Sequence, residues 1–441
     1  MPYHHATVDP IVAGRVLVYD LILSLMISRQ SLTDLRLHET TSSSAKCSQQ
    51  GLLESAASDT TTAMLAGRSS DKWDCLSVTP PVTMSSSFKQ PGPGPSASKA
   101  CVYSKAGNPS RNTLEACFAA LEGAKHCFTF ASGMGAITTA ILLLKKGQHI
   151  VVMNDVDGAT RSLFSKSNKM DIEVTFTDLS VPGNLEKSIK SNTKMVFFET
   201  PTNPVLKVID IAAVAKAAKS RGDIIVVVDN TFLTPYLQKP LKFGADIVLY
   251  SITKYLTGLT DVVMGAILVN DDIIADKLKH LQCVAGIVPS PFDCYMVNRS
   301  LKTLPLRMER HKESALLVAG WLDMHPKIVE VLHPGLPTHP NHDLGRRQMS
   351  GHSGVFSFRH CGGLKESKKF LYALKVFTLS VSLGGYESLA EIPWLMTHAF
   401  IPEKDRLALG ITNSLVRISV GLEDVLDLLE DLDRALRIAF G

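Results

Sequence analysis

One lysine of this sequence stands where a buried strand is expected to end. Residues 246–251 are rich in branched apolar side chains, follow Gly244 and lead to Lys254. A lysine in that place can be desolvated, which lowers its pKa and frees the amine to form a Schiff base with an aldehyde. The spacing alone equally allows a solvated lysine after a strand. Lys254 is the candidate catalytic residue because a carboxylate and several polar residues are expected around it.

A carboxylate follows a second apolar run in the same way. Residues 224–228 are apolar and lead directly to Asp229. Both Asp229 and Lys254 therefore emerge at strand ends, where ligands of parallel sheets bind. Pyridoxal phosphate needs this pair, because a lysine holds its aldehyde carbon and a carboxylate pairs with its pyridinium nitrogen. The sequence thus predicts pyridoxal 5'-phosphate as the cofactor.

A phosphate site is expected beside these two residues. Ser132, Gly133 and Met134 form an expected turn between a strand and a helix, where backbone N–H groups can hold a phosphate. Ser251 and Thr253 flank the lysine, and their hydroxyl groups could reach the same phosphate. Each feature is weak alone, because such turns and strand ends are common without a ligand.

Two further polar residues could contact a substrate or the cofactor. Asn203 follows another expected strand, within residues 199–204, and its amide could touch the hydroxyl side of the cofactor ring. Arg417 lies within an expected strand at residues 415–420. A partly buried arginine needs an anionic partner, and its planar fork suits an amino-acid carboxylate. The alternative for Arg417 is a structural ion pair.

The elements that position these residues alternate between strands and helices, which predicts a mostly parallel sheet covered on both faces. Beyond about residue 290 the pattern changes to that of a smaller α+β domain. Strands are expected at 126–130, 149–153, 173–177, 194–199, 224–229, 246–251, 265–270, 329–333, 354–359 and 415–420, and helices at 112–121, 137–145, 210–220, 291–303, 306–324, 364–374 and 425–440.

Composition excludes several classes of protein. The chain has 441 residues, 45% hydrophobic and 20% charged, with a net charge of +4 and no basic block, so nucleic acid is not an expected partner. Eight cysteines are scattered without a C-x-x-C pair or zinc-like spacing, which predicts reduced thiols, no metal site and a cytoplasmic location.

The first hundred residues differ from the rest. An apolar run at 16–27 is short and contains Asp20, so no membrane span is expected. Residues 1–60 are expected to be disordered or to arise from an upstream start codon, with targeting as an alternative. Residues 61–105 are rich in Pro, Ser and Gly and are expected to form an arm on a neighbouring subunit. Domains are expected at 106–300 and 301–441.

A family resemblance covers the chain from about residue 61 to residue 441. The sequence resembles the carbon–sulfur lyases of the Cys/Met-metabolism pyridoxal-phosphate enzymes. The segments that carry it are Tyr103–Asn112, Ala131–Met134, Glu199–Pro204, Val227–Phe232, Ser251–Tyr255, Asp261–Gly265, Ser382–Gly385 and Arg417–Asp424.

The resemblance implies a fold and a role for each matching residue. The fold would be the fold-type-I, aspartate-aminotransferase-like fold, with a seven-stranded sheet and a smaller C-terminal domain. Lys254 would bind the cofactor covalently and shuttle protons, and Asp229 would pair with the pyridine nitrogen. The residues implied to bind the phosphate are Gly133, Met134, Ser251 and Thr253. The resemblance also implies a homotetramer, built as a dimer of dimers, in which Tyr103 and Lys105 of a neighbouring subunit help to bind that phosphate. The residues implied to bind the substrate are Asn203, Ser382 and Arg417.

The implied reaction is α,γ-elimination of L-cystathionine to L-cysteine, 2-oxobutanoate and ammonia, with side reactions that release hydrogen sulfide. Two alternatives stay open. One is γ-elimination of methionine or homocysteine, or γ-synthase chemistry, on another amino-acid thioether. The other is a folded relative with impaired catalysis.

These alternatives arise from departures at the expected site. The family places a ring-stacking tyrosine, which can also transfer a proton, where this chain has Asp157. Losing that aromatic contact could cost about 1 kcal/mol. Lys105 replaces an arginine of the phosphate site and lacks its bidentate fork. Val381 replaces a glutamate that places the distal amino group of cystathionine, so valine favours shorter, apolar thioethers. Ser162 also replaces an arginine, and Ala159 stands where methionine γ-lyases carry cysteine.

Overall fold

The computed structural model describes residues 57–67, 70, 73, 76–93 and 101–441, and most of the expected N-terminal extension lies outside this part of the chain. The described chain begins with a helix that the sequence analysis did not predict, α3 (Asp59–Leu65). The side chain of Ser58 caps it, and Ala63 is buried against the rest of the protein. The arm therefore starts with a segment that packs on its own chain.

The larger of two sheets has seven strands in the order β1-β7-β6-β5-β4-β2-β3. All pairings are parallel except those of β7 with β1 and β6. The expected seven-stranded, mostly parallel sheet is therefore confirmed. Its strands are β1 (His126–Phe130), β2 (His149–Met153), β3 (Glu173–Thr177), β4 (Thr193–Glu199), β5 (Ile225–Asp229), β6 (Ile247–Ser251) and β7 (Gly265–Val269).

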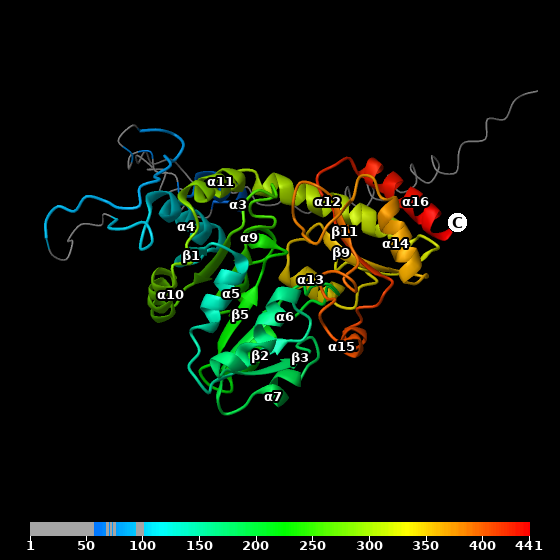
Figure 1. Cartoon of the computed structure of the whole chain (residues 1–441), viewed down its shortest axis with the longest axis horizontal. Helices are drawn as coiled ribbons and strands as arrows, with labels where there is room; N and C mark the ends of the chain where they lie inside the picture. The colour runs from blue at the N-terminus through cyan, green and yellow to red at the C-terminus, as the bar shows by residue number, and fades with distance from the viewer. Residues whose placement is uncertain (1–56, 68–69, 71–72, 74–75, 94–100) are drawn as a thin grey trace, which may run out of the picture. The chain divides into compact units, whose positions relative to one another are not determined.

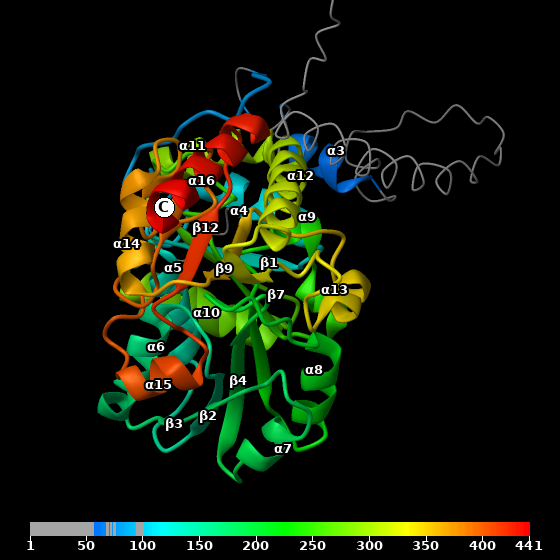
Figure 2. The ribbon, with the colours of Figure 1, turned by 90° about the vertical axis from the view of Figure 1, so that its right-hand side faces the viewer.

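The strands at the centre of this sheet are almost wholly apolar because helices cover both of its faces. Figure 2 shows α5 and α6 on one side of the sheet and α8 on the other. The helices of this region are α4 (Pro109–Glu122), α5 (Gly133–Ile141), α6 (Gly158–Ser165), α7 (Asn184–Ser188), α8 (Ile211–Lys219), α9 (Thr234–Leu237), α10 (Asp272–Ala285) and α11 (Pro291–Leu301), with short 3-10 turns at Ser167–Met170 and Pro240–Phe243.

A second sheet has five strands in the order β10-β11-β12-β9-β8. Helices α12, α14 and α16 pack together on it around a separate apolar cluster (Figure 1). The strands are β8 (Ile328–Leu332), β9 (Val355–His360), β10 (Thr378–Leu379), β11 (Leu389–Glu391) and β12 (Leu415–Ser419), and the helices are α12 (Leu304–Asp323), α13 (His342–Gln348), α14 (Leu364–Ala373), α15 (Glu403–Ala408) and α16 (Val425–Phe440).

One expected boundary was wrong in a way that affects the site. Residues 132–135 were predicted as a turn and 137–145 as a helix, whereas α5 begins at Gly133 and ends at Ile141. The glycines tolerate the helical conformation because Ser132 caps the first turn, where its hydroxyl oxygen accepts a hydrogen bond from the Gly135 N–H at 3.0 Å. In the described part of the chain, no helix has the length and apolar character of a membrane span.

Candidate active site

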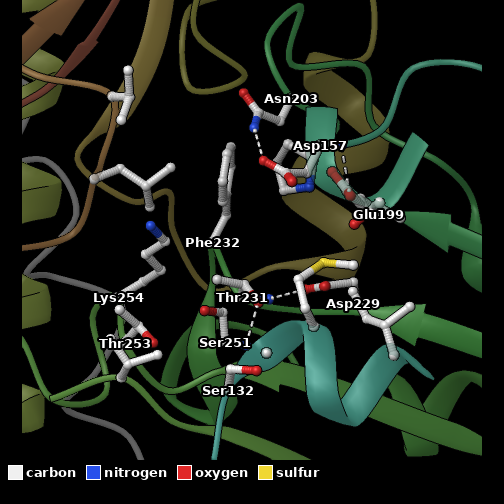
Figure 3. Close-up of a pocket in the computed structure, with 18 of the residues that line it drawn as sticks. Ser132, Asp157, Glu199, Asn203, Asp229, Thr231, Phe232, Ser251, Thr253 and Lys254 are labelled. Carbon is white, nitrogen blue, oxygen red and sulfur yellow. Dashed lines mark hydrogen bonds between the residues drawn. The ribbon is translucent and has the colours of Figure 1, made fainter. Parts of the chain in front are cut away.

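The carboxyl ends of β5 and β6 bring Asp229 and Lys254 into one cavity of about 250 Å³ (Figure 3). Lys254 lies three residues beyond β6, and its Nζ donates a hydrogen bond to Ser382 Oγ at 3.0 Å. Burial, together with the positive charge of Arg417, lowers the pKa of the Lys254 amine. The lysine is therefore partly desolvated, and its neutral form is more accessible than that of a solvated lysine.

Asp229 is the carboxylate at the end of the neighbouring strand. Its Oδ1 accepts a hydrogen bond from the backbone N–H of Thr231 at 2.9 Å. Burial raises the pKa of Asp229 to about 6, and the charge of Asp157 adds to this rise. A cationic partner would offset the cost of ionising this buried acid. A protonated pyridine nitrogen would be such a partner, so Asp229 fits the predicted cofactor.

The N-terminus of α5 lies against the end of β6, at the place where a phosphate is expected to bind. A side chain at Gly133 would place its Cβ 3.0 Å from Ser251 Cβ, so any larger residue would push Ser251 away from the helix. Met134 follows in the first helical turn, where backbone N–H groups lack helical acceptors. Thr253 also lines the cavity, but its hydroxyl exchanges hydrogen bonds with the backbone of Met264 at 3.0 and 3.2 Å. To contact a phosphate as expected, the Thr253 hydroxyl would have to share its hydrogen bonds between the phosphate and the backbone of Met264.

Arg417 reaches the cavity from the other sheet, and it forms the structural ion pair that was the alternative expectation for it. In the ladder between β11 and β12 it stands directly opposite Glu391, and its Nη1 lies 2.8 Å from Glu391 Oε1. Both side chains are almost wholly buried, at 2% and 0% exposed. The same Nη1 donates to Asn203 Oδ1 at 3.0 Å. Arg417 is thus half of a buried ion pair and also a wall of the cavity.

Glu391 and several residues that line the cavity were not predicted from the sequence, among them Glu199, Thr231 and Phe232. Glu199 ends β4 beside Asp229, and burial with the charges of Asp229 and Asp157 raises its pKa well above the ordinary value. Thr231 and Phe232 follow Asp229 and complete the wall. The family motifs include Glu199, Thr231 and Phe232, and Glu199 also ends a parallel strand. These three residues could therefore have been predicted from the sequence. Glu391 gave no local signal.

Asp157 is the residue for which the family resemblance implied a tyrosine. Its Oδ1 caps α6 by accepting from the Ala159 N–H at 2.9 Å, and its Oδ2 accepts from Asn203 Nδ2 at 3.3 Å. Its own backbone N–H donates to Glu199 Oε1 at 2.8 Å. Among the described residues that line the cavity, the aromatic ring belongs to Phe232, which stands between Lys254 and Asp157 (Figure 3).

Of the remaining predicted site residues, two lie at the cavity and two lie on the arm, away from it. Val381 lines the cavity and is 54% exposed, and Ser382 contacts Lys254. Tyr103 is 50% exposed on the arm, where it pairs with Ser87 in an isolated β-bridge. Neither Tyr103 nor Lys105 lines the cavity within a single chain. These two residues would need another subunit to reach such a site.

Three kinds of comparison bear on this site. A family model described as Cys/Met metabolism PLP-dependent enzyme matches residues 60–437. A cystathionine gamma-lyase of Mus musculus is 49% identical over 393 residues, which are 89% of this chain and 98% of that protein. A putative cystathionine gamma-lyase 2 of Caenorhabditis elegans is 52% identical over 382 residues, or 86% and 97% of the two chains. The structure of a cystathionine gamma-lyase from Lactobacillus plantarum complexed with L-serine superposes with a TM-score of 0.83 at 37% identity, covering 87% of this chain and 99% of that one.

Proposed function

Because this chain belongs to the Cys/Met metabolism PLP-dependent enzyme family, we propose that it cleaves L-cystathionine by α,γ-elimination to L-cysteine, 2-oxobutanoate and ammonia. It is a lyase whose cofactor is pyridoxal 5'-phosphate. The observation that carries the proposal is the convergence of Lys254, Asp229 and Arg417 on one cavity from three different strands. An amine, a ring-nitrogen partner and a carboxylate receptor are what an amino-acid lyase of this kind requires.

Each part of the cavity has a place for one part of the cofactor. Asp229 would pair with the ring nitrogen, and Lys254 would hold the aldehyde carbon. The first backbone N–H groups of α5, at Gly133 and Met134, and the hydroxyl of Ser251 would hold the phosphate. When bound, the cofactor supplies an electron sink that stabilises negative charge at the substrate α carbon.

Lys254 would move protons once the amino group of the substrate has displaced it from the cofactor. Its Nζ is held by Ser382 at 3.0 Å, and its lowered pKa favours the neutral amine that can accept a proton. After accepting one, the ammonium can return it to a neighbouring carbon or to the leaving sulfur. The charge of Arg417 lowers this pKa, while those of Asp157 and Glu391 oppose the change, so the balance of these groups tunes the base.

The carboxylate of the substrate would bind Arg417. The four terminal N–H bonds of this guanidinium already have protein acceptors: Glu391, Asn203 and the backbone carbonyls of Val381 and Ser382, the last two at 2.9 and 3.2 Å. A carboxylate must therefore replace or share one of them. The carbonyls of residues 381 and 382 belong to a partly exposed loop, so we expect this loop to yield.

A second substrate class is favoured by one observation. The rim of the cavity carries Val381 and Val263, which are 54% and 62% exposed, and the buried Leu383 also lines the cavity. An apolar rim suits a short thioether such as methionine or homocysteine better than the distal ammonium of cystathionine. We therefore retain γ-elimination of such a thioether as the alternative.

The assembly and location extend the proposal. A homotetramer, built as a dimer of dimers, would bring Tyr103 and Lys105 of one subunit to the cavity of its neighbour. Their exposure on the arm supports this arrangement. The arm at 61–105 would thus serve a partner, and domains at 106–300 and 301–441 would enclose the cavity. The described cysteines are free thiols, which suits a cytoplasmic location.

The test combines a spectrum with product analysis. Purified protein loaded with pyridoxal phosphate should show visible absorbance that changes when cystathionine is added, and both cysteine and 2-oxobutanoate should form. Visible absorbance without these products, but with 2-oxobutanoate from methionine, would favour the alternative substrate. A protein that binds no cofactor would contradict the proposal.

A further inference from the structure

Asp157 is a carboxylate at the position where relatives would present a neutral aromatic ring. It is half-buried, lines the cavity and lies across it from Lys254 (Figure 3). Its Oδ1 is used by the helix α6, but its Oδ2 has only a long hydrogen bond of 3.3 Å from Asn203 Nδ2. This oxygen can therefore accept a stronger donor from a ligand.

The other carboxylates of the cavity are committed elsewhere. Asp229 is the partner of the ring nitrogen. Glu199 accepts the backbone N–H of Asp157, and its raised pKa favours the protonated, neutral form. Glu391 is paired with Arg417 at 2.8 Å. Among the acids that surround this cavity in the described chain, Asp157 is the one placed to attract a cation.

Asp157 and Arg417 are held at a fixed separation by Asn203. The amide nitrogen of Asn203 donates to Asp157 Oδ2, and its amide oxygen accepts from Arg417 Nη1 at 3.0 Å. A single carboxamide therefore spans the gap between an anion and a cation that line the same cavity. The α-carbon of an amino acid joins an ammonium and a carboxylate over a similarly short span, with the opposite charge at each end.

We propose that Asp157 receives the α-ammonium group of the amino-acid substrate while Arg417 receives its carboxylate, so that the two residues together recognise the zwitterion. Asp157 then takes the place of the family tyrosine as a contact to the amino group rather than as a stacking ring. This inference rests on the proposed amino-acid substrate but not on which thioether is cleaved.

The experiment compares two ligands that differ by the ammonium group alone. L-norleucine and hexanoate have the same carbon chain, and neither carries a γ-sulfur that could leave. Affinities for both are measured by calorimetry on the cofactor-loaded protein and on its Asp157→Asn variant, each first reduced with borohydride so that the amino group of norleucine cannot displace Lys254 and bond to the cofactor. Asparagine keeps the helix cap and removes the charge. The matched control is Asp210→Asn, because Asp210 caps α8 through the Ala213 N–H at 2.9 Å, outside the cavity.

A charge-assisted hydrogen bond predicts that Asp157→Asn lowers the affinity for norleucine about ten-fold or more. The affinity for hexanoate should stay the same or increase, because a negative charge near a bare carboxylate is removed. Asp210→Asn should change neither. Equal losses for both ligands, or no loss for norleucine, would overturn the proposal.

Two further outcomes are informative. If Asp157→Asn does not fold, Asp157→Ser replaces it, because serine also caps helices and carries no charge. If the protein fails to cleave cystathionine but norleucine binding still depends on Asp157, the proposed reaction is wrong and the recognition of the zwitterion stands.

Discussion

Replacing Glu391 by leucine should destabilise the folded protein strongly, because it would leave Arg417 charged and buried. Glu391 is wholly buried, 2.8 Å from Arg417 Nη1. Breaking a buried pair by removing one partner typically costs about 3–5 kcal/mol. Arg417 keeps Asn203 and two backbone carbonyls as acceptors, so we expect the low end, about 3 kcal/mol.

The assay is urea unfolding of the cofactor-loaded protein, followed by circular dichroism. The single variant should shift the midpoint without a large change in slope. The double variant Glu391→Leu with Arg417→Met should recover most of the loss, because an apolar pair of similar size avoids the desolvation penalty of two charges. The matched control removes an exposed pair: Asp171→Asn releases Lys146, whose Nζ lies 3.2 Å from Asp171 Oδ2, and should change stability little.

Two results would refute this reasoning. One is a loss below about 1 kcal/mol for Glu391→Leu, which would mean that Arg417 is solvated or satisfied without its partner. The other is a double variant less stable than the single one, which would mean that Arg417 stabilises the sheet independently of Glu391.

Three other predictions follow from the described contacts. Val381→Glu should raise the turnover of cystathionine relative to methionine in steady-state assays, since it adds an acceptor for the distal ammonium at the cavity rim; an unchanged ratio would exclude Val381 from specificity. Gly133→Ala should weaken cofactor binding in an equilibrium titration, because its Cβ would lie 3.0 Å from Ser251, whereas Gly320→Ala, with open space around it, should not. Burial lowers the pKa of His311 in the folded protein to about 4, whereas the ordinary pKa of histidine is 6.5. Between these two pH values His311 binds a proton in the unfolded chain but not in the folded protein. The free energy of unfolding should therefore fall as the pH drops from about 6.5 to 4. His311→Asn should flatten that fall in pH-dependent unfolding, and an unchanged profile would assign it to other groups.

The sequence by itself determined the architecture of the large sheet and the two residues at its centre. Runs of branched apolar residues specify buried parallel strands locally, and the residue after each run must emerge at the carboxyl edge. Position alone indicated that Asp229 and Lys254 would emerge at strand ends, and the polar residues expected around them, together with the family motifs, made them candidates for the site. The same reasoning placed the start of α5 wrongly, because glycines signal a turn unless a cap such as Ser132 stabilises the helix.

Only the tertiary structure decided which partners these residues meet and how burial shifts their pKa values. Glu391 meets Arg417 because β11 and β12 pair in one register, and no spacing along the chain encodes that register. The carboxylate of Asp157 meets Asn203 because the start of α6 lies against the loop after β4, a contact that the sequence did not show. The pKa of Lys254 depends first on its burial and then on the charges of Arg417, Asp157 and Glu391, which come from distant segments. Local pattern specifies which residues reach an edge, whereas pairing and burial among distant elements set the chemistry that they can perform.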